Sequence, residues 1–398
     1  MVDYRKEPIS SITEDTPQNF SRFVIGFFGT VFILATGLII ASIYINPFGY
    51  FGTTGQFETY NARRAKAAYL LKLPREELPD AWIIGSSNML PFQPRTLNRF
   101  FDTQNAFNLG SYWGRAEDLW SWTNFIVHDL SAAPKVVILG VEPWTFADDQ
   151  RGPPLLSQYR RRLIVTKNLA KYLPEYSDLR YQVSRLLDSL TIQNMRIMAR
   201  MVRKNGFRRR QVRALESNPR FNIDGTSRPL SKIEADPFLP PEINDLYRRA
   251  VERSTYNTDP NSLSEARRNV TASHYIRLDD VVNFLPGDRM QPEDFALFRE
   301  TIALLHSRNI EVGIIMLPTH PYFYDLLVKH TNYVEHLNEL KEFLKSLQAE
   351  FENVNTVLDA SHIYKFRGKP DAFHDKYHMT PINTDLVLER LHQDWRKK

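Results

Sequence analysis

Two short segments, far apart along the sequence, carry side chains that together could perform nucleophilic chemistry. One is a Gly-Ser-Ser motif at 85–87, directly after an apolar run, and the other is an Asp-x-x-His motif at 375–378. A serine hydroxyl is a weak nucleophile unless a base lies within hydrogen-bond reach and a third group orients that base. We therefore predict Ser87 as nucleophile, His378 as general base and Asp375 as its orienting partner, the parts of a serine acyl-transfer site.

Both motifs also have purely structural interpretations. Gly-Ser-Ser is often a turn with capping serines, and Asp-x-x-His can be a loop with a local hydrogen bond before a helix. His374 and His378 stand four residues apart, a spacing that suits metal binding on a helix. Pro381 close behind them indicates a boundary between loop and helix, however, and no third ligand stands out. We predict neither a metal nor a cofactor.

The elements that must position these residues follow an alternating pattern. Short apolar runs rich in β-branched residues predict buried strands at 81–84, 135–141, 311–317 and 354–358, with a weaker one at 106–109. Helical stretches lie at about 58–73, 115–128, 293–307 and 331–350, and Thr380-Pro381 predicts the start of a last helix. This alternation predicts an α/β fold with a doubly wound parallel sheet. The motif at 85–87 would then lie at the carboxyl end of the sheet, where such folds place their sites.

The stretch from about 150 to 290 does not follow this pattern. It has no clear strand, and it predicts a helical segment at about 176–204. Its charged residues between 195 and 213 are all basic, and Arg196, Arg200 and Arg203 fall on one helical face. Two interpretations stay open: a surface that contacts anionic headgroups or an anionic polymer, and a solvated face of an inserted helical subdomain. No nucleic-acid motif accompanies the arginines, so nucleic acid is not a predicted partner.

A membrane anchor is predicted near the amino terminus. The run from Phe23 to Ile45 has no charge and no proline, and at about 1.5 Å per residue it is long enough to cross about 30 Å of hydrocarbon. It is longer than a typical signal-peptide core, and no A-x-A-like cleavage site follows it. The alternative is a buried core helix, but three glycines within the uniformly apolar run fit a membrane helix better.

Composition and charge limit the classes of chemistry and of partner that the chain can have. The chain has 398 residues, no cysteine and a net charge of +5. Thiol catalysis and disulfides are therefore excluded, and the modest positive charge suits work near anionic lipid or polymer without requiring it. The basic residues on the two flanks of the apolar run are similar in number, so the positive-inside rule does not orient it. A short tail before a long remainder favours an N-in signal anchor.

Three motifs, in their order, resemble those of the SGNH (GDSL-like) hydrolase superfamily. They are the strand followed by Gly85-Ser86-Ser87, the glycine block at 108–114 (Asn-Leu-Gly-Ser-Tyr-Trp-Gly), and the terminal Asp-x-x-His. The anchor and the Gly-Ser-Ser variant make the chain most similar to the membrane-anchored branch, which includes the D-alanyl-lipoteichoic acid protein and the alginate O-acetylation proteins. The resemblance covers roughly 80–145 and 305–398. It implies a three-layer α/β/α domain and a triad of Ser87, His378 and Asp375.

The resemblance also implies further roles. The backbone N–H of Ser87 and that of Gly114, or alternatively Gly110, would stabilise the oxyanion. The third block of the superfamily reads G-x-N, but this chain has Glu142 at the Asn position, and an ionised carboxylate cannot donate a hydrogen bond. Either Glu142 points elsewhere, or the hole uses two donors, or the site does something other than ordinary hydrolysis.

Other side chains near the predicted strand ends are candidates for substrate contact. They are Glu142, Trp144, His320 and Tyr322, the last two in a proline-bounded loop after the strand at 311–317. A loop with an exposed histidine is an equally good interpretation of His320. The aromatic residues Tyr112, Trp113 and Trp144 could stack on sugar rings or belong to the core.

Together these observations predict the following organisation: a tail (1–20), a transmembrane anchor (21–45), a juxtamembrane linker and helix (46–79), and an SGNH-like domain (80–398) with an arginine-rich helical insertion at about 150–290. The expected activity is acyl transfer to, or ester removal from, a cell-envelope polysaccharide outside the cytoplasm. The resemblance implies a membrane-bound O-acyltransferase as partner. The rival hypothesis is a non-catalytic glycan-binding or assembly protein on an SGNH scaffold.

Overall fold

The computed structural model describes the parts of the chain that carry the predicted site. The described residues are 17–47, 51, 54–55, 62–147, 167–173, 176–207, 210–211, 215, 222–227 and 290–395. Most of the predicted tail (1–20) and most of the predicted insertion (150–290) lie outside them.

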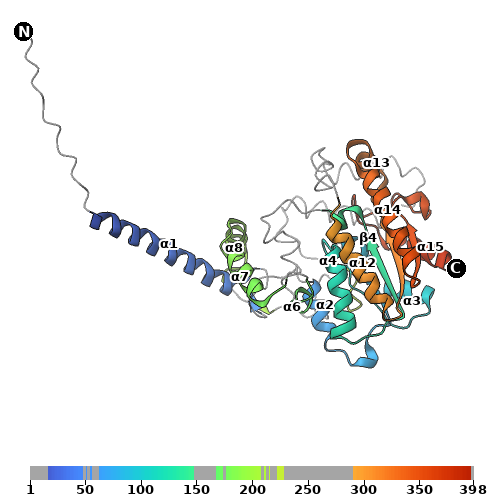
Figure 1. Ribbon diagram of the computed structural model, residues 1–398, viewed down its shortest axis with the longest axis horizontal. Coiled ribbons are helices and arrows are strands. Elements are labelled where there is room, and N and C mark those ends of the chain that lie inside the picture. Colours follow the sequence, from blue (N-terminus) through green and yellow to red (C-terminus); the bar gives the residue numbers. More distant parts are fainter. Residues whose placement is uncertain are drawn as a thin grey trace, which may run out of the picture.

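Five parallel strands form the central sheet, in the order β3-β2-β4-β6-β7 (Figure 1). Their bounds are Ala81–Ile84 for β2, Ala106–Asn108 for β3, Val136–Val141 for β4, Glu311–Met316 for β6 and Val354–Asp359 for β7. Every residue of β2, β3 and β4 is buried, as expected for parallel strands covered on both faces. The sequence-based prediction of a parallel α/β sheet is confirmed, and each strand lies within about one residue of the predicted run.

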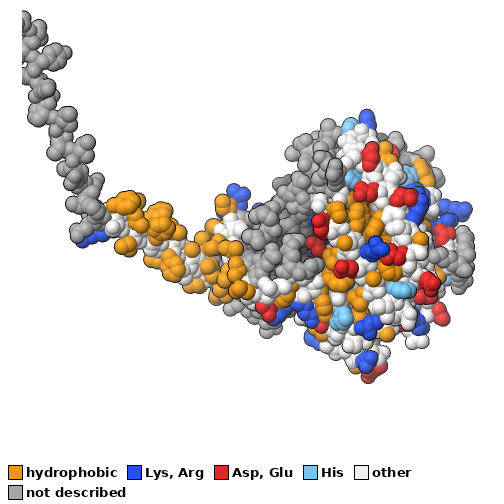
Figure 2. Space-filling view, in the orientation of Figure 1, with side chains coloured by type: hydrophobic (Ala, Val, Ile, Leu, Met, Phe, Trp, Pro, Cys, Tyr) orange, Lys and Arg blue, Asp and Glu red, His pale blue; other side chains and the backbone are white. Residues whose placement is uncertain are grey.

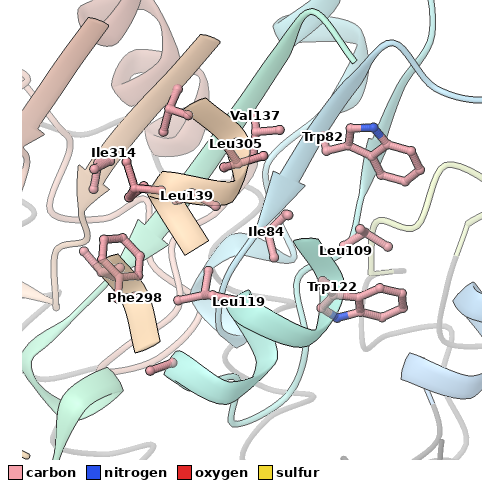
Figure 3. Close-up of a cluster of buried hydrophobic side chains, with 14 of the residues drawn as sticks. Trp82, Ile84, Leu109, Leu119, Trp122, Val137, Leu139, Phe298, Leu305 and Ile314 are labelled. Atoms are coloured by element: carbon pink, nitrogen blue, oxygen red, sulfur yellow. The ribbon is translucent and has the colours of Figure 1, made fainter. Parts of the chain in front are cut away.

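Helices cover both faces of this sheet. Side chains of α4, α12 and α14 pack on one face, and those of α3 and α15 pack on the other. The bounds of these helices are Ala116–Asn124, Pro292–His306, Tyr333–Glu350, Pro94–Phe101 and Pro381–Trp395. Figure 3 shows how the first core joins strand and helix residues, with Trp82 and Ile84 of β2 beside Leu119 and Trp122 of α4. The result is a three-layer α/β/α arrangement.

The strand order places a topological switch point beside β2. From β2 the chain runs through α3 to β3 on one side of it, and then returns through α4 to β4 on the other side. The loops after β2 and β4 therefore leave the sheet next to each other at the carboxyl edge, which is where open α/β sheets bind ligands. Ser87 follows β2 and Glu142 follows β4, so the topology brings their two loops together.

The helix α1 (Pro17–Ile45) projects away from the α/β domain (Figure 1). It contains a stretch, Phe20–Ile45, that is long and apolar enough to cross a membrane, and the 18-residue window on which this rests has no buried residue. Its side chains form the long hydrophobic surface in Figure 2. An unburied apolar surface of this length is not what a core helix of a water-exposed domain presents.

The remaining described elements are shorter or connect the others. They are β1 (Thr54–Gly55), α2 (Ala62–Leu70), α6 (Lys167–Ala170), α7 (Asp178–Ser189), α8 (Ile192–Asn205), β5 (Arg210–Gln211), α13 (Pro321–His330) and single turns of 3₁₀ or π helix. The single helix predicted at 176–204 is wrong in one respect: Leu190 and Thr191 interrupt it, and the Thr191 hydroxyl caps α8 by accepting from the N–H of Asn194. Helices α3 and α13 were not predicted from the sequence.

Candidate active site

Ser87 lies at the sharp turn that ends β2. Ser86 caps a short 3₁₀ turn, Ser87–Met89, by accepting a hydrogen bond from the N–H of Asn88 at 3.1 Å. The turn is tight because a Cβ atom at Gly85 would stand 2.7 Å from the carbonyl oxygen of Gly140 in β4. Glycine is therefore required for β2 and β4 to approach this closely, and Ser87 is left half-buried rather than enclosed.

Asp375 and His378 lie in a tight loop between β7 and α15. A bridge between Phe373 and Met379 closes the loop. One carboxylate oxygen of Asp375 accepts hydrogen bonds from the backbone N–H groups of Tyr377 and His378, at 2.7 and 2.8 Å. The buried carboxylate thus fixes the loop that carries its own histidine, which explains the three-residue spacing of the motif.

The three predicted residues form a connected row. His378 Nδ1 lies 2.7 Å from Asp375 Oδ2, and His378 Nε2 lies 2.9 Å from Ser87 Oγ. Because a carboxylate only accepts hydrogen bonds, Nδ1 carries the proton, and Nε2 accepts from the serine hydroxyl. Asp375 is buried, whereas the His378 side chain keeps 23% of its surface exposed. These distances are within the range of a preformed nucleophile, base and orienting group.

The electrostatics around His378 favour its protonated form. Burial lowers the pKa of His378, but the charge and hydrogen bond of Asp375, together with the charge of Glu142, outweigh burial and raise that pKa above its ordinary value. A raised pKa makes the imidazole a stronger base, which suits a group that must remove a proton from serine.

The predicted oxyanion donors are only partly available. The N–H of Gly110 donates to the side chain of Asn108 at 2.8 Å, and the N–H of Gly114 donates to the carbonyl of Ser111 at 2.9 Å. The N–H of Ser87 makes no hydrogen bond to any residue that the structure describes. In this arrangement Ser87 offers an open donor, and the two glycines do not.

Gly114 has a steric role instead. A Cβ atom at this position would stand 2.6 Å from the carbonyl oxygen of Gly85. The N–H of Ser111 in the same loop donates to that carbonyl at 2.9 Å. The glycine block at 108–114 therefore packs directly on the turn that holds Ser87.

Glu142 is buried beneath the serine turn and contacts both neighbours of Ser87. Its Oε1 atom accepts from the hydroxyl of Ser86 at 3.3 Å and from the side-chain amide of Asn88. Burial raises the pKa of Glu142 from its ordinary 4.5 to about 7, against the opposing effect of those two hydrogen bonds. The carboxyl thus holds the turn in place rather than pointing to solvent, and near neutral pH it exists in both protonation states.

This burial predicts a pH dependence of stability. The unfolded carboxyl ionises near 4.5 and the folded one near 7, so the folded state loses stability as pH rises through this window. The difference between the two pKa values corresponds to a loss of about 3 kcal/mol in the free energy of unfolding, and this loss is complete once the pH exceeds the pKa of the folded state. Glu142→Gln, which cannot ionise, is expected to remove this loss. Denaturant unfolding of both proteins at several pH values between about 4.5 and 8 measures it.

Glu352→Gln is the matched control, because Glu352 is exposed after α14 and makes no contact with the site. The control variant should follow the wild-type pH profile. Equal pH profiles for wild type and Glu142→Gln would show that Glu142 does not ionise in this window.

Two tryptophans lie near the serine turn. The rings of Trp113 and Trp144 meet edge to face with their centroids 6.2 Å apart. Trp113 is 45% exposed and belongs to the glycine block, while Trp144 is half-buried two residues after Glu142. Their positions leave aromatic surface accessible beside the predicted nucleophile.

The structure gives His320 a structural position. Its ring is buried, its Nδ1 accepts from the N–H of Tyr322 at 3.1 Å, and it caps the helix α13. The expectation of an exposed histidine loop is therefore wrong, because Pro321 starts a helix there. Tyr322 is half-buried at the start of that helix. Neither side chain belongs to the row of contacts formed by Ser87, His378 and Asp375.

Two buried basic side chains on α2 contact the glycine block and were not predicted from the sequence. The Arg63 guanidinium pairs with both oxygens of Asp118 and donates to the carbonyl of Tyr112 at 3.0 Å. Lys66 Nζ donates to the carbonyl of Gly110 at 2.8 Å. Burial, reinforced by Arg63, lowers the pKa of Lys66 well below its usual range. The helix α2, which follows the apolar helix α1, thus holds the glycine block through two buried basic side chains.

Comparison with known proteins does not extend these observations. No family model matches the chain, and no curated protein matches it either. Among the described residues, no group of three or more His, Asp or Glu side chains is placed to hold a metal ion. The geometry of Ser87, His378 and Asp375 is therefore the feature on which a function must be argued.

Proposed function

We propose that this protein is a membrane-anchored serine acyltransferase or acyl esterase that acts on a cell-envelope polysaccharide. The observation that carries the proposal is the unbroken row Ser87–His378–Asp375, with contacts of 2.9 and 2.7 Å. Ser87 lies at the switch point of a parallel sheet, the usual place for a site in this kind of fold. The resemblance of the three sequence motifs to SGNH hydrolases agrees with this choice.

In the first half of the proposed reaction, Ser87 Oγ attacks the carbonyl carbon of an ester or thioester. His378 Nε2 takes the hydroxyl proton as the Oγ–C bond forms. The N–H of Ser87 donates to the developing oxyanion. His378 then returns the proton to the departing alcohol or thiol as its bond to the carbonyl carbon breaks, which leaves an acyl-serine.

In the second half, a hydroxyl group of the acceptor attacks the acyl-serine. His378 Nε2 accepts the proton of this hydroxyl and returns it to Ser87 Oγ as the acyl–serine bond breaks. A sugar hydroxyl in this role gives acyl transfer, and water gives hydrolysis. The two activities therefore use the same side chains and differ in which hydroxyl reaches the intermediate.

The single open oxyanion donor has a consequence for rate. Losing one donor of an oxyanion hole costs about 3 kcal/mol of transition-state stabilisation. Gly114 and Gly110 reach the oxyanion only if their loop rearranges, because their N–H groups already donate within the loop. We expect a slow enzyme whose glycine block rearranges when the acyl group binds.

The proposed acceptor is a glycan because aromatic surface borders the nucleophile. Trp113 and Trp144 present ring faces and edges of the kind that pack on the C–H faces of sugars. The span Phe20–Ile45 would hold the domain on the outer face of the membrane. By the same resemblance, a membrane-bound O-acyltransferase would deliver the acyl group.

One observation favours a second candidate function. Glu142 stands where SGNH enzymes carry an Asn donor, and the glycine N–H groups are engaged, as a scaffold without catalysis would allow. A non-catalytic glycan-binding or assembly protein would keep the fold and the tryptophans. It would have no use for an aligned serine, histidine and carboxylate.

Labelling with a fluorophosphonate probe distinguishes the two candidates. The probe reacts with activated serines, so wild-type protein in membranes should be labelled, and Ser87→Ala should not be. His378→Ala should label slower by several orders of magnitude, because it keeps the nucleophile without its base. Ser346→Ala is the matched control, since Ser346 is an exposed serine on α14 whose hydroxyl donates within its own helix, to the carbonyl of Phe343.

The outcomes are distinct. Labelling that disappears with Ser87→Ala and persists with Ser346→Ala supports the acyltransferase or esterase. Wild-type protein that stays unlabelled, even in native membranes that contain the partner, excludes an activated serine and favours the glycan-binding scaffold.

A further inference from the structure

The helices α7 and α8 form a pair that packs on the last turns of α1. Ser42 of α1 accepts a hydrogen bond from the amide of Asn194 at 2.6 Å, and its hydroxyl lies 3.3 Å from the carbonyl of Ser189. Ile45 packs with Met198 and Met201 of α8. Because these contacts lie at the C-terminal end of the apolar span, they place the helix pair beside the point where the span ends.

The outward face of α7 is apolar. Leu179, Val183, Leu186 and Leu187 follow helical spacing along one side and are between 39 and 77% exposed. The buried side of the same helix carries Arg185 and Ser189. A helix on a water-exposed surface has the reverse arrangement, with its apolar stripe inside. The observed pattern fits a helix whose outer side meets an apolar medium.

The outward face of α8 is basic. Arg196, Arg200 and Arg203 are exposed on one side, opposite the buried Met198 and Met201. The helix contains no acidic residue. Figure 2 shows the hydrophobic surface of α1 continuing onto the segment at its end, with basic side chains at the outer edge of that segment. Apolar and arginine surfaces side by side match the acyl and phosphate layers of a bilayer interface.

We infer that α7 and α8 form an interfacial hairpin that lies on the membrane beside α1, with the α7 leucine face in the acyl boundary and the α8 arginines on anionic lipid phosphates. The partner is the lipid surface rather than a soluble anionic polymer, because a polymer would leave the α7 leucine face in water. The inference rests on the proposed membrane insertion of α1 and is independent of the proposed catalysis.

The hairpin has a consequence for the active site. A single membrane helix joined to a domain by a linker lets that domain swing. A second contact with the surface, fixed to α1 through Ser42 and Asn194, restricts this motion. The domain would then be held at a defined height and orientation above the bilayer, where an acyl group delivered from the membrane arrives.

The absence of cysteine from the chain allows a direct test with single-cysteine variants of the full-length protein. Val183→Cys reports the α7 face, Leu34→Cys reports the apolar span, and Ala349→Cys reports exposed α14 in the α/β domain. Each is labelled with an environment-sensitive fluorophore in phosphatidylcholine nanodiscs, with or without phosphatidylglycerol and with a lipid-borne quencher. The probes at 183 and 34 should emit at shorter wavelength and be quenched several-fold more than the probe at 349.

Each outcome decides a separate point. A probe at 183 that behaves like the probe at 349, while the probe at 34 is quenched, refutes the hairpin and leaves the anchor intact. A probe at 34 that also stays unquenched refutes the membrane insertion on which the hairpin depends.

The contribution of the α8 arginines to lipid binding is tested separately. Phosphatidylglycerol should increase quenching at 183, and the triple variant Arg196→Gln, Arg200→Gln, Arg203→Gln should reduce it to the phosphatidylcholine value. The triple variant Arg299→Gln, Arg308→Gln, Lys345→Gln removes the same charge from the α/β domain and should leave the increase unchanged. An increase that survives loss of the three α8 arginines overturns their assignment to lipid phosphates.

Discussion

Asp375→Asn is expected to lower kcat by about 10⁴-fold while leaving the fold intact. An asparagine side chain can still accept the two backbone hydrogen bonds that Tyr377 and His378 donate to Oδ1, so the loop keeps its shape. Its amide group then faces His378 Nδ1 where a carboxylate oxygen stood. The amide donates to Nδ1 and forces the proton onto Nε2, which can no longer accept from Ser87.

Steady-state hydrolysis of a chromogenic acetyl ester and the rate of fluorophosphonate labelling both measure this effect. KM should change little, because Asp375 is buried and does not contact substrate. The pH dependence is a second readout: without the Asp375 charge, the pKa of His378 falls, so any residual activity persists to lower pH.

Asp371→Asn is the matched control for this prediction. Asp371 precedes the same loop, is half-buried and makes no contact with the triad. It should keep wild-type kcat and melting temperature. An Asp375→Asn variant with activity within tenfold of wild type would show that the observed contact to His378 does not orient the base.

The sequence predicted the sheet well because its signals are local. Each strand is a short run of β-branched residues between turn residues. Because both faces of the sheet are buried, the strands read as continuous apolar runs. The helices α3 and α13 both begin with a proline, after Gln93 and His320, and the proline at 321 also fits a proline-bounded loop. Proline at the first turn of a helix fits both interpretations when only the sequence is available.

The contact between two of the predicted site residues could be read from the sequence, because one turn contains both of them. Asp375 and His378 are neighbours in a loop, so their contact follows from spacing, and strand order then brings Ser87 to them. The oxyanion donors could not be predicted in this way. Whether an N–H is open depends on the hydrogen bonds inside a loop, and the glycines at 110 and 114 use theirs on Asn108 and Ser111.

The role of α2 could not be predicted from the sequence either. Arg63 and Lys66 are basic residues after a predicted membrane span, a position that normally indicates a solvated flank. Their burial depends on partners far along the chain, the carboxylate of Asp118 and the carbonyl of Gly110. Only the folded structure shows that these charges hold the glycine block rather than face headgroups or water.

This contact leads to the second large prediction: Arg63→Ala should destabilise the domain by about 3–5 kcal/mol. The substitution leaves the buried carboxylate of Asp118 without its bidentate partner and removes a donor from the carbonyl of Tyr112. The expected fall in melting temperature is on the order of 10 °C for a domain of this size. Calorimetry of the full-length protein in nanodiscs measures it, and Lys72→Ala, at an exposed position after α2, is the control that should change little.

A double substitution separates an unpaired charge from a lost contact. Arg63→Met with Asp118→Leu removes both charges and keeps apolar volume, so it should recover much of the lost stability, as replacement of buried ion pairs often does. The double variant should nevertheless be labelled more slowly than wild type by a fluorophosphonate. Its glycine block lacks the Arg63 donor to the carbonyl of Tyr112, which helps to hold that block on the serine turn. If the double variant recovers stability and is also labelled as fast as wild type, then the contacts of α2 stabilise the fold but do not affect the reactivity of Ser87.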